Sequence, residues 1–151
     1  MNDRLIKKLK LLKQSKHRKV NNQFIAEGKR LVREAINCGN AVDLLFCTKT
    51  FYEKNKSDWQ GFLEVGSTMI KILTDSQFKS ISSTYTPSGI AALCNIPRST
   101  YIDFKIREWI YLDKIRDPGN LGTILRSALW FGFKNIILSS KSVDPYNPKA
   151  I

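Results

Sequence analysis

Apolar strand patterns alternate with helix patterns along most of the chain, and this alternation limits the possible folds more than any other feature of the sequence. Short apolar runs predict strands at 24–27, 42–47, 69–73, 90–96, 109–112 and 135–138. Apolar residues at helical spacing predict helices at 3–13, 31–36, 49–63 and 75–81, and another that starts at Leu121. Residues 14–22 are expected to form a polar loop. Helices and strands interleaved in this order are typical of an α/β fold.

The apolar periodicity lapses between Pro97 and Arg107, which divides the 151 residues into two parts. We expect a first domain at 1–96, a linker at 97–107 and a second domain at 108–151. The last two predicted strands are apolar on both faces and flank a helix, as in the parallel βαβ unit that opens a doubly wound domain. Two parallel strands and one helix cannot bury both faces of a sheet, so the second domain is expected to be incomplete.

Positive charge is concentrated at the start of the chain. The sequence has 25 Lys and Arg against 13 Asp and Glu, and its first 34 residues hold eleven basic and three acidic side chains. This excess favours a polyanionic partner, either nucleic acid or an anionic membrane surface. The apolar stretch at 5–12 is interrupted by lysines, is too short to span a bilayer, and precedes no signal-peptide cleavage site. We therefore expect a cytoplasmic protein with no membrane association.

Cysteine and histidine are sparse. Cys38, Cys47 and Cys94 are far apart in sequence and His17 is the single histidine, so no metal site is expected. Cys47 and Cys94 end apolar runs and are expected to be buried, reduced thiols. His17 lies among basic residues, where it is either a solvated loop residue or a phosphate contact.

The segment 117–122 has the composition of a turn that leads into a helix. Pro118 and Gly119 predict a type II turn, after which Asn120 is placed to cap the helix. Gly122 then lies in the first helical turn, where glycine costs about 1 kcal/mol relative to alanine, so we expect another group to approach closely there. The pattern matches neither Gly-x-Gly-x-x-Gly nor a P-loop, which argues against dinucleotide oxidoreductases and NTPases.

Arg126 follows Gly122 by one helical turn. Because helical side chains lean toward the N-terminus, we expect Arg126 to reach back over Gly122 toward the carboxyl end of the preceding strand. The alternatives are that Arg126 is a solvated surface cation and that Asn120 is an ordinary cap. The apolar face of this helix is expected to hold Leu121, Ile124, Leu125, Ala128, Leu129 and Phe131.

Two segments carry a family resemblance. Residues 112–128 (LDKIRDPGNLGTILRSA) resemble the first motif of the SpoU (TrmH) branch of the SPOUT RNA ribose methyltransferases. Residues 24–35 (FIAEGKRLVREA) resemble the signature of the family's N-terminal substrate-binding domain. The similarity continues through 142–150, which in the family leads into the second motif. We therefore expect the chain to be truncated before the second and third motifs, and to be inactive by itself.

The resemblance implies a fold and an activity. The fold is a small N-terminal α/β/α ribosomal-protein-like RNA-binding domain, followed by the opening βαβ of a SPOUT (trefoil-knot) methyltransferase domain. The activity is transfer of a methyl group from S-adenosylmethionine to a ribose 2'-hydroxyl, with large-subunit rRNA as the favoured substrate, by a homodimer formed through the complete methyltransferase domain. Matched to the first motif, Asn120 and Arg126 are the catalytic residues. Cofactor-binding residues are expected only in the motifs absent from this chain.

The expected RNA contacts are basic residues of the loop at 13–19, together with one basic residue from each motif. They are Lys13, Lys16, His17, Arg18, Lys19, Arg30 and Arg116. Two other functions stay open: a non-catalytic RNA-binding module, and a family member that acts on tRNA.

Overall fold

The computed structural model describes residues 3–37, 42–64, 69–97, 105 and 108–151. The chain divides into two compact units, Met1–Pro97 (unit 1) and Arg98–Ile151 (unit 2). The linker predicted at 97–107 lies mostly outside the described residues. Both units alternate helices with strands, so the chain has the predicted α/β fold.

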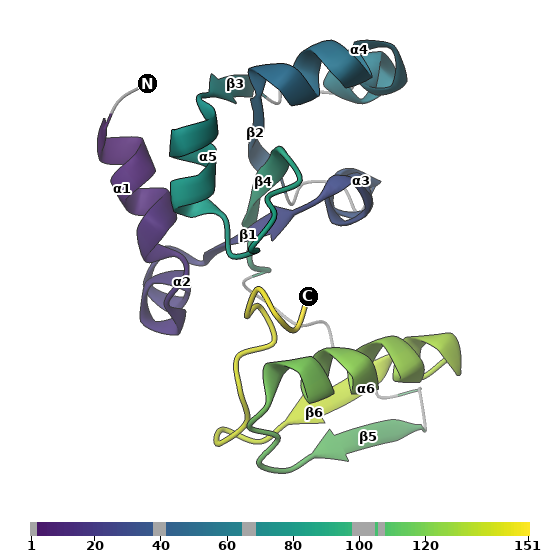
Figure 1. Ribbon diagram of the computed structural model, residues 1–151. Helices are drawn as coiled ribbons and strands as arrows, with labels where there is room; N and C mark the ends of the chain where they lie inside the picture. Colours follow the sequence, from purple (N-terminus) through teal and green to yellow (C-terminus); the bar gives the residue numbers. More distant parts are fainter. Residues whose placement is uncertain (1–2, 38–41, 65–68, 98–104, 106–107) are drawn as a thin grey trace. The chain divides into compact units, whose positions relative to one another are not determined.

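Unit 1 is built on a four-stranded sheet with the order β1-β4-β2-β3 (Figure 1). Its strands are β1 (Gln23–Glu27), β2 (Val42–Thr48), β3 (Met69–Leu73) and β4 (Ile90–Asn95). β4 is antiparallel to both of its neighbours, whereas β2 and β3 are parallel. All four strands were predicted from their apolar runs, within one residue at each end.

Helices cover both faces of this sheet (Figure 1). One core joins α1 (Asp3–Leu11) and α5 (Asp75–Ile81) to the face that carries Phe46. The other joins α3 (Lys29–Asn37) and α4 (Lys49–Glu64) to the face that carries Leu45 and Cys47. Successive β2 side chains thus enter opposite cores, as the period of two in a strand requires. The expected α/β/α arrangement is present.

The loop predicted at 14–22 is wrong, because residues Ser15–Asn21 form a helix, α2. Arg18 lies in this helix with only 1% of its surface exposed. Its Nη1 donates hydrogen bonds to the carbonyl oxygens of Leu12 (2.9 Å) and Lys13 (2.8 Å), just after α1 ends. The guanidinium therefore ties α2 to the end of α1, and it satisfies carbonyls that a helix terminus leaves without partners.

Unit 2 consists of β5 (Trp109–Leu112), α6 (Pro118–Trp130) and β6 (Asn135–Leu138). β5 and β6 are parallel, with Trp109 opposite Asn135 and Leu112 opposite Leu138. This is the predicted βαβ unit, with α6 along one face of the strand pair (Figure 1). Tyr111 and Ile137 are cross-strand neighbours and are 62% and 45% exposed, so the other face is not buried by the described residues, as expected.

Helix α6 begins three residues earlier than predicted. Asp117 is its N-cap, and the Asp117 carboxylate accepts a hydrogen bond from the backbone N–H of Asn120 (2.7 Å). Pro118 occupies the first turn, where its fixed φ suits a helix and its missing N–H costs nothing. Gly119 does not have a positive φ. The predicted type II turn and the predicted cap at Asn120 are therefore both wrong.

The predicted apolar face of α6 is partly wrong. Leu121 and Ala128 are buried, but Leu129 and Phe131 are largely exposed, as is Trp130. The strand pair underneath is only four residues long in each strand, and it covers a narrow stripe of the helix. The C-terminal end of α6 consequently leaves three large apolar side chains in solvent.

Candidate functional site

Arg126, Gly122 and Ala150 come together on one side of α6. Arg126 Nη1 donates a hydrogen bond to the carbonyl oxygen of Ala150 (3.3 Å). A Cβ placed on Gly122 would lie 3.0 Å from Arg126 Nη1 and would collide with the Ala150 carbonyl oxygen. Both expectations for this turn are confirmed: Arg126 reaches over Gly122, and another group approaches Gly122 closely. That group is the chain's own backbone.

Hydrogen bonds fix the loops that follow the two strands of unit 2. The backbone N–H of Lys114 donates to Ser139 Oγ (2.8 Å), and that of Ile115 donates to Ser142 Oγ (3.2 Å). The N–H of Val143 donates to the Ile115 carbonyl (2.7 Å). These bonds join the carboxyl ends of β5 and β6, the edge at which parallel α/β sheets bind ligands.

The segment after these loops places the Ala150 carbonyl. Asp144 Oδ1 accepts from the N–H of Tyr146 (2.9 Å), and Asn147 Oδ1 accepts from the N–H of Lys149 (3.0 Å). Burial, with the nearby Asp144 charge, raises the pKa of Tyr146. Ala150 itself is buried. The position of the carbonyl beside Arg126 thus follows from local turns in the chain.

Asn120, the second predicted catalytic residue, is exposed in the first turn of α6. Its backbone hydrogen bond goes to Asp117. The hydrogen bonds of the described residues join Arg126 to Ala150 and do not join Asn120 to Arg126. The structure therefore brings Arg126 together with Gly122, whereas Asn120 shares only the helix.

The predicted RNA contacts lie in different environments. Five of them are exposed: Lys13, Lys16, Lys19, Arg30 and Arg116. Arg30 also pairs with Glu34 on the same helix (3.2 Å), and His17 is half-buried. For Arg18 the prediction of a phosphate contact is wrong, because its guanidinium is buried against backbone carbonyls. Arg18 instead holds α2 against the end of α1.

Sequence reasoning missed a basic groove on unit 1. The groove has a volume of about 570 Å³, and its lining includes Lys29, Lys54 and Lys79. These lysines come from α3, α4 and α5, and only the folded sheet brings them together. The one available signal was Lys29, which directly follows Gly28 inside the 24–35 motif.

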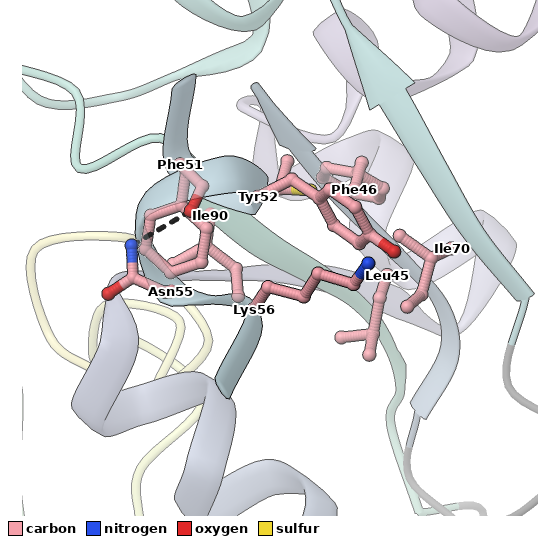
Figure 2. A pocket seen from close by; sticks show the side chains of 9 residues that line it. Leu45, Phe46, Phe51, Tyr52, Asn55, Lys56, Ile70 and Ile90 are labelled. Carbon is pink, nitrogen blue, oxygen red and sulfur yellow. Dashed lines mark hydrogen bonds between the residues drawn. The ribbon is translucent and has the colours of Figure 1, made fainter. Parts of the chain in front are cut away.

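A second, apolar cavity lies between α4 and the sheet of unit 1 (Figure 2). Leu45, Ile70 and Ile90 line it together with the first turns of α4, where Asn55 Nδ2 donates to the Phe51 carbonyl (2.8 Å). Its volume of about 10 Å³ admits at most one water molecule. The cavity is therefore a packing gap in the core and not a ligand site.

The thiols behave as predicted. Cys47 and Cys94 are free and buried, whereas Cys38 lies outside the described residues. Burial raises the pKa of Cys47 to about 11 and the pKa of Cys94 to about 12. Both thiols are therefore protonated and unreactive at neutral pH.

Metal-ligand clusters and membrane-spanning helices are both absent from the described part of the chain. No group of three or more His, Cys, Asp or Glu side chains is placed there to hold a metal ion. Each helix there also falls short of the length and apolar character that a membrane crossing demands.

Comparison with known proteins assigns both units. Residues 3–92 match the MRM3-like substrate binding domain, and residues 108–151 match the SpoU rRNA Methylase family. An α/β substrate-binding domain joined to the start of an RNA methylase domain defines the class. The chain belongs to the SpoU (TrmH) family of RNA methyltransferases.

Relatives from three organisms agree with this assignment. The chain is 31% identical to the Bacillus subtilis 23S rRNA (guanosine(2553)-2'-O)-methyltransferase RlmP over 146 residues. The aligned region covers 97% of this chain and 55% of RlmP. It is 32% identical to the mitochondrial rRNA methyltransferase 3 of Xenopus laevis, over 98% of this chain and 36% of the relative. The AdoMet-bound rRNA methyltransferase of Sinorhizobium meliloti superposes with a TM-score of 0.75 at 28% identity, over 97% of this chain and 55% of that one. The chain therefore spans about half of these proteins, or less.

The family assignment implies S-adenosylmethionine, but the described residues of unit 2 do not fit it. The Ala150 carbonyl lies where a Cβ of Gly122 would be, and it accepts a hydrogen bond from Arg126. The sheet edge beside it offers the ends of only two strands. These residues form one side of a site and not a cofactor pocket.

Proposed function

We propose that the protein to which this chain belongs transfers a methyl group to a ribose 2'-hydroxyl of large-subunit rRNA, with S-adenosylmethionine as the methyl donor. The order of the two matched domains and the rRNA substrates in the names of the relatives support this substrate class. The proposal includes a homodimer as the working unit and the cytoplasm as its location. Free, buried Cys47 and Cys94 suit a reducing compartment.

The observation that carries the proposal is the position of Arg126. Its guanidinium lies over a glycine that leaves room for it, and the buried Ala150 carbonyl holds it there. A ribose hydroxyl is a poor nucleophile at neutral pH, so an enzyme must stabilise the negative charge that develops on its oxygen. A guanidinium keeps its proton above pH 12, and it therefore suits this electrostatic role better than proton abstraction.

Unit 1 is proposed to bind the RNA. Two separate sets of exposed lysines are candidate surfaces for it, one on the α2 side and one in the groove at the other end of the sheet. RNA carries a phosphate at every nucleotide, and such a surface attracts it without reading its sequence. Structured RNA recognised through shape and backbone is the partner that this charge distribution favours.

Methyl transfer by the whole product of the gene tests the proposal. The protein is incubated with S-adenosylmethionine carrying a labelled methyl group and with unmodified large-subunit rRNA or total tRNA. The RNA is then digested to nucleosides and analysed by mass spectrometry. A labelled 2'-O-methylnucleoside from rRNA alone is expected. Label found only in tRNA would show that the substrate is tRNA and not rRNA. RNA binding without any methyl transfer would show that the protein is a non-catalytic RNA-binding module.

A further inference from the structure

The basic groove of unit 1 lies at one end of the four-stranded sheet. Thr48, the last residue of β2, and Gly89, which precedes β4, both line it. Three lysines enter it from three different helices: Lys29, Lys54 and Lys79. Asp75 is the one carboxylate among its lining residues. A concave surface with three cations and one anion concentrates positive potential, and such a surface favours a polyanion.

Backbone contacts make the floor of the groove rigid. The N–H of Thr48 donates to the Gly89 carbonyl (2.9 Å), and the Thr48 hydroxyl accepts from the N–H of Phe51 (3.1 Å) at the start of α4. Gly89 has a φ of +80°, and a Cβ there would lie 3.0 Å from Thr48 Oγ1. Lys29 Nζ lies 5.5 Å from the centre of the Phe51 ring, which holds this ammonium near the groove.

Glu27 holds in place the loop at 82–89, which forms one wall of the groove. Its carboxylate accepts hydrogen bonds from Ser82 Oγ (2.6 Å), the Ser83 N–H (3.0 Å) and Thr84 Oγ1 (3.0 Å). Tyr85 follows directly on this loop and is 98% exposed, two residues before Pro87 lines the groove. An aromatic ring held in solvent on a fixed loop is a stacking surface for an unpaired base.

The groove is distinct from the basic region predicted at 13–19. Helix α2 leads into Gln23, which pairs with Asn95, whereas Glu27 pairs with Ala91 at the groove end. The region 13–19 therefore adjoins the opposite end of the sheet. A strand of five residues separates the two ends by about 17 Å. Lysine substitutions at the two ends can thus distinguish the two surfaces.

We propose that this groove binds the phosphate backbone of RNA beside an unpaired nucleotide, whose base stacks on Tyr85. The proposal rests on the function proposed above, since it takes RNA as the partner of unit 1. The three lysines contact consecutive phosphates, and the floor at Thr48 and Gly89 sets how deeply the backbone enters. Glu27 acts as a positioning residue, because it holds the Tyr85 loop without touching the RNA.

Two matched triple variants of the 151-residue chain test the groove. One is Lys29→Gln, Lys54→Gln and Lys79→Gln, and the other is Lys13→Gln, Lys16→Gln and Lys19→Gln. Both remove three exposed lysines from unit 1. Affinity for a fluorescent RNA hairpin with a bulge is measured by anisotropy against salt concentration. The groove variant is expected to reduce the slope of log affinity against log salt by about two to three, and the control variant by less than about one.

Equal losses in both variants, or a larger loss in the control, would overturn the groove as the binding surface. A circular dichroism spectrum and a melting temperature like those of the unchanged chain are required of each variant. If the unchanged chain binds no RNA at all, both this inference and the RNA partner of the proposed function fail. If the unchanged chain binds RNA and only the control variant weakens it, this inference alone fails.

Single substitutions test the stacking role of Tyr85. Tyr85→Ala is expected to weaken binding of the bulged hairpin about ten-fold, and to leave binding of a fully paired duplex unchanged. Tyr85→Phe keeps the ring and is expected to bind the bulged hairpin like the unchanged chain. Unchanged binding of the bulged hairpin by Tyr85→Ala would contradict the stacking.

Discussion

At the scale of single residues, Gly122 has the strictest steric requirement in unit 2. It is buried, and the Ala150 carbonyl and the Arg126 guanidinium both lie where its side chain would be. A backbone carbonyl held by local turns cannot move away as a flexible side chain does. The glycine therefore sets the distance between α6 and the segment at 144–151.

Gly122→Ala is expected to destabilise unit 2 by about 1 kcal/mol or more. Overpacking costs about 1–3 kcal/mol, which exceeds the gain of about 1 kcal/mol in helix propensity. Urea unfolding followed by tryptophan fluorescence measures the effect. Ser127→Ala, at an exposed position of the same helix, serves as the control and should change stability by about 0.5 kcal/mol or less. A net stabilisation by Gly122→Ala would contradict the close approach.

The two buried thiols predict a loss of stability in alkali. In the folded chain the pKa of Cys47 is about 11 and the pKa of Cys94 about 12, against an ordinary value of about 9. Above pH 9 the unfolded chain releases these protons while the folded chain keeps them. The free energy of unfolding should then fall by about 1.4 kcal/mol per pH unit for each thiol, up to the folded pKa values.

Urea titrations at pH 8, 9 and 10 measure this slope. A Cys47→Ala, Cys94→Ala double variant is the reference, because it keeps every other titrating group. Its stability should fall less steeply with pH than that of the unchanged chain. Identical slopes would show that the thiols titrate normally in the folded state.

At the scale of elements, sequence periodicity predicted the strands of the described residues and most of their helices. It failed for α2, where polar contacts determine the structure. Apolar runs as short as 42–47, bounded by turn residues, are typical of buried strands, so their extents were predictable. Helix α2 has no apolar stripe, and its stability comes from Arg18 bonding to Leu12 and Lys13. A basic run in a sequence gives no sign that one of its arginines will be buried.

Arg18→Ala is expected to destabilise unit 1 by about 2–4 kcal/mol. It removes two hydrogen bonds from a charged donor and leaves buried carbonyls without that partner. Lys19→Ala is the matched control, since it removes a neighbouring exposed charge and should cost less than about 0.5 kcal/mol. Chemical denaturation compares the two. Equal effects would mean that Arg18 lies in solvent.

The start of α6 shows the same limit on sequence reasoning. Asp117 and Asn120 both have the short polar side chains of N-caps, and the sequence alone did not separate them. The structure selects Asp117, because Pro118 and Gly119 then complete the first helical turn. The interaction of Gly122 with Arg126 was predictable nonetheless, since their spacing of four is independent of where the helix begins. The approach of Ala150, from 28 residues further along, was not.

At the scale of the whole molecule, we propose that the two units divide the function. Unit 1 has the basic groove, and unit 2 has a parallel strand pair and Arg126, which donates to the Ala150 carbonyl. The family motifs imply the same division, and it stays a prediction. The groove was not predictable, because its three lysines are 25 residues apart along the chain and meet only in the folded sheet.

Residues 1–151 alone are expected to show no measurable binding of S-adenosylmethionine. The described residues of unit 2 form a two-stranded sheet with one helix, which provides one side of a site. Isothermal titration calorimetry on this polypeptide, with the gene's whole product as the positive control, measures it. A micromolar dissociation constant for residues 1–151 would show that the cofactor site is already complete.

The most direct measurement of the central claim is the methylation rate of an Arg126→Ala variant of the gene's whole product. With saturating RNA, the single-turnover rate should fall by about 10² or more, the scale of losing one preorganised electrostatic group. The free energy of unfolding should change by less than about 1 kcal/mol, because the side chain is exposed. Arg126→Lys should restore little of the rate, since an ammonium lacks the planar guanidinium fork. An alanine variant that loses stability but keeps its single-turnover rate would contradict the account and make Arg126 a structural residue.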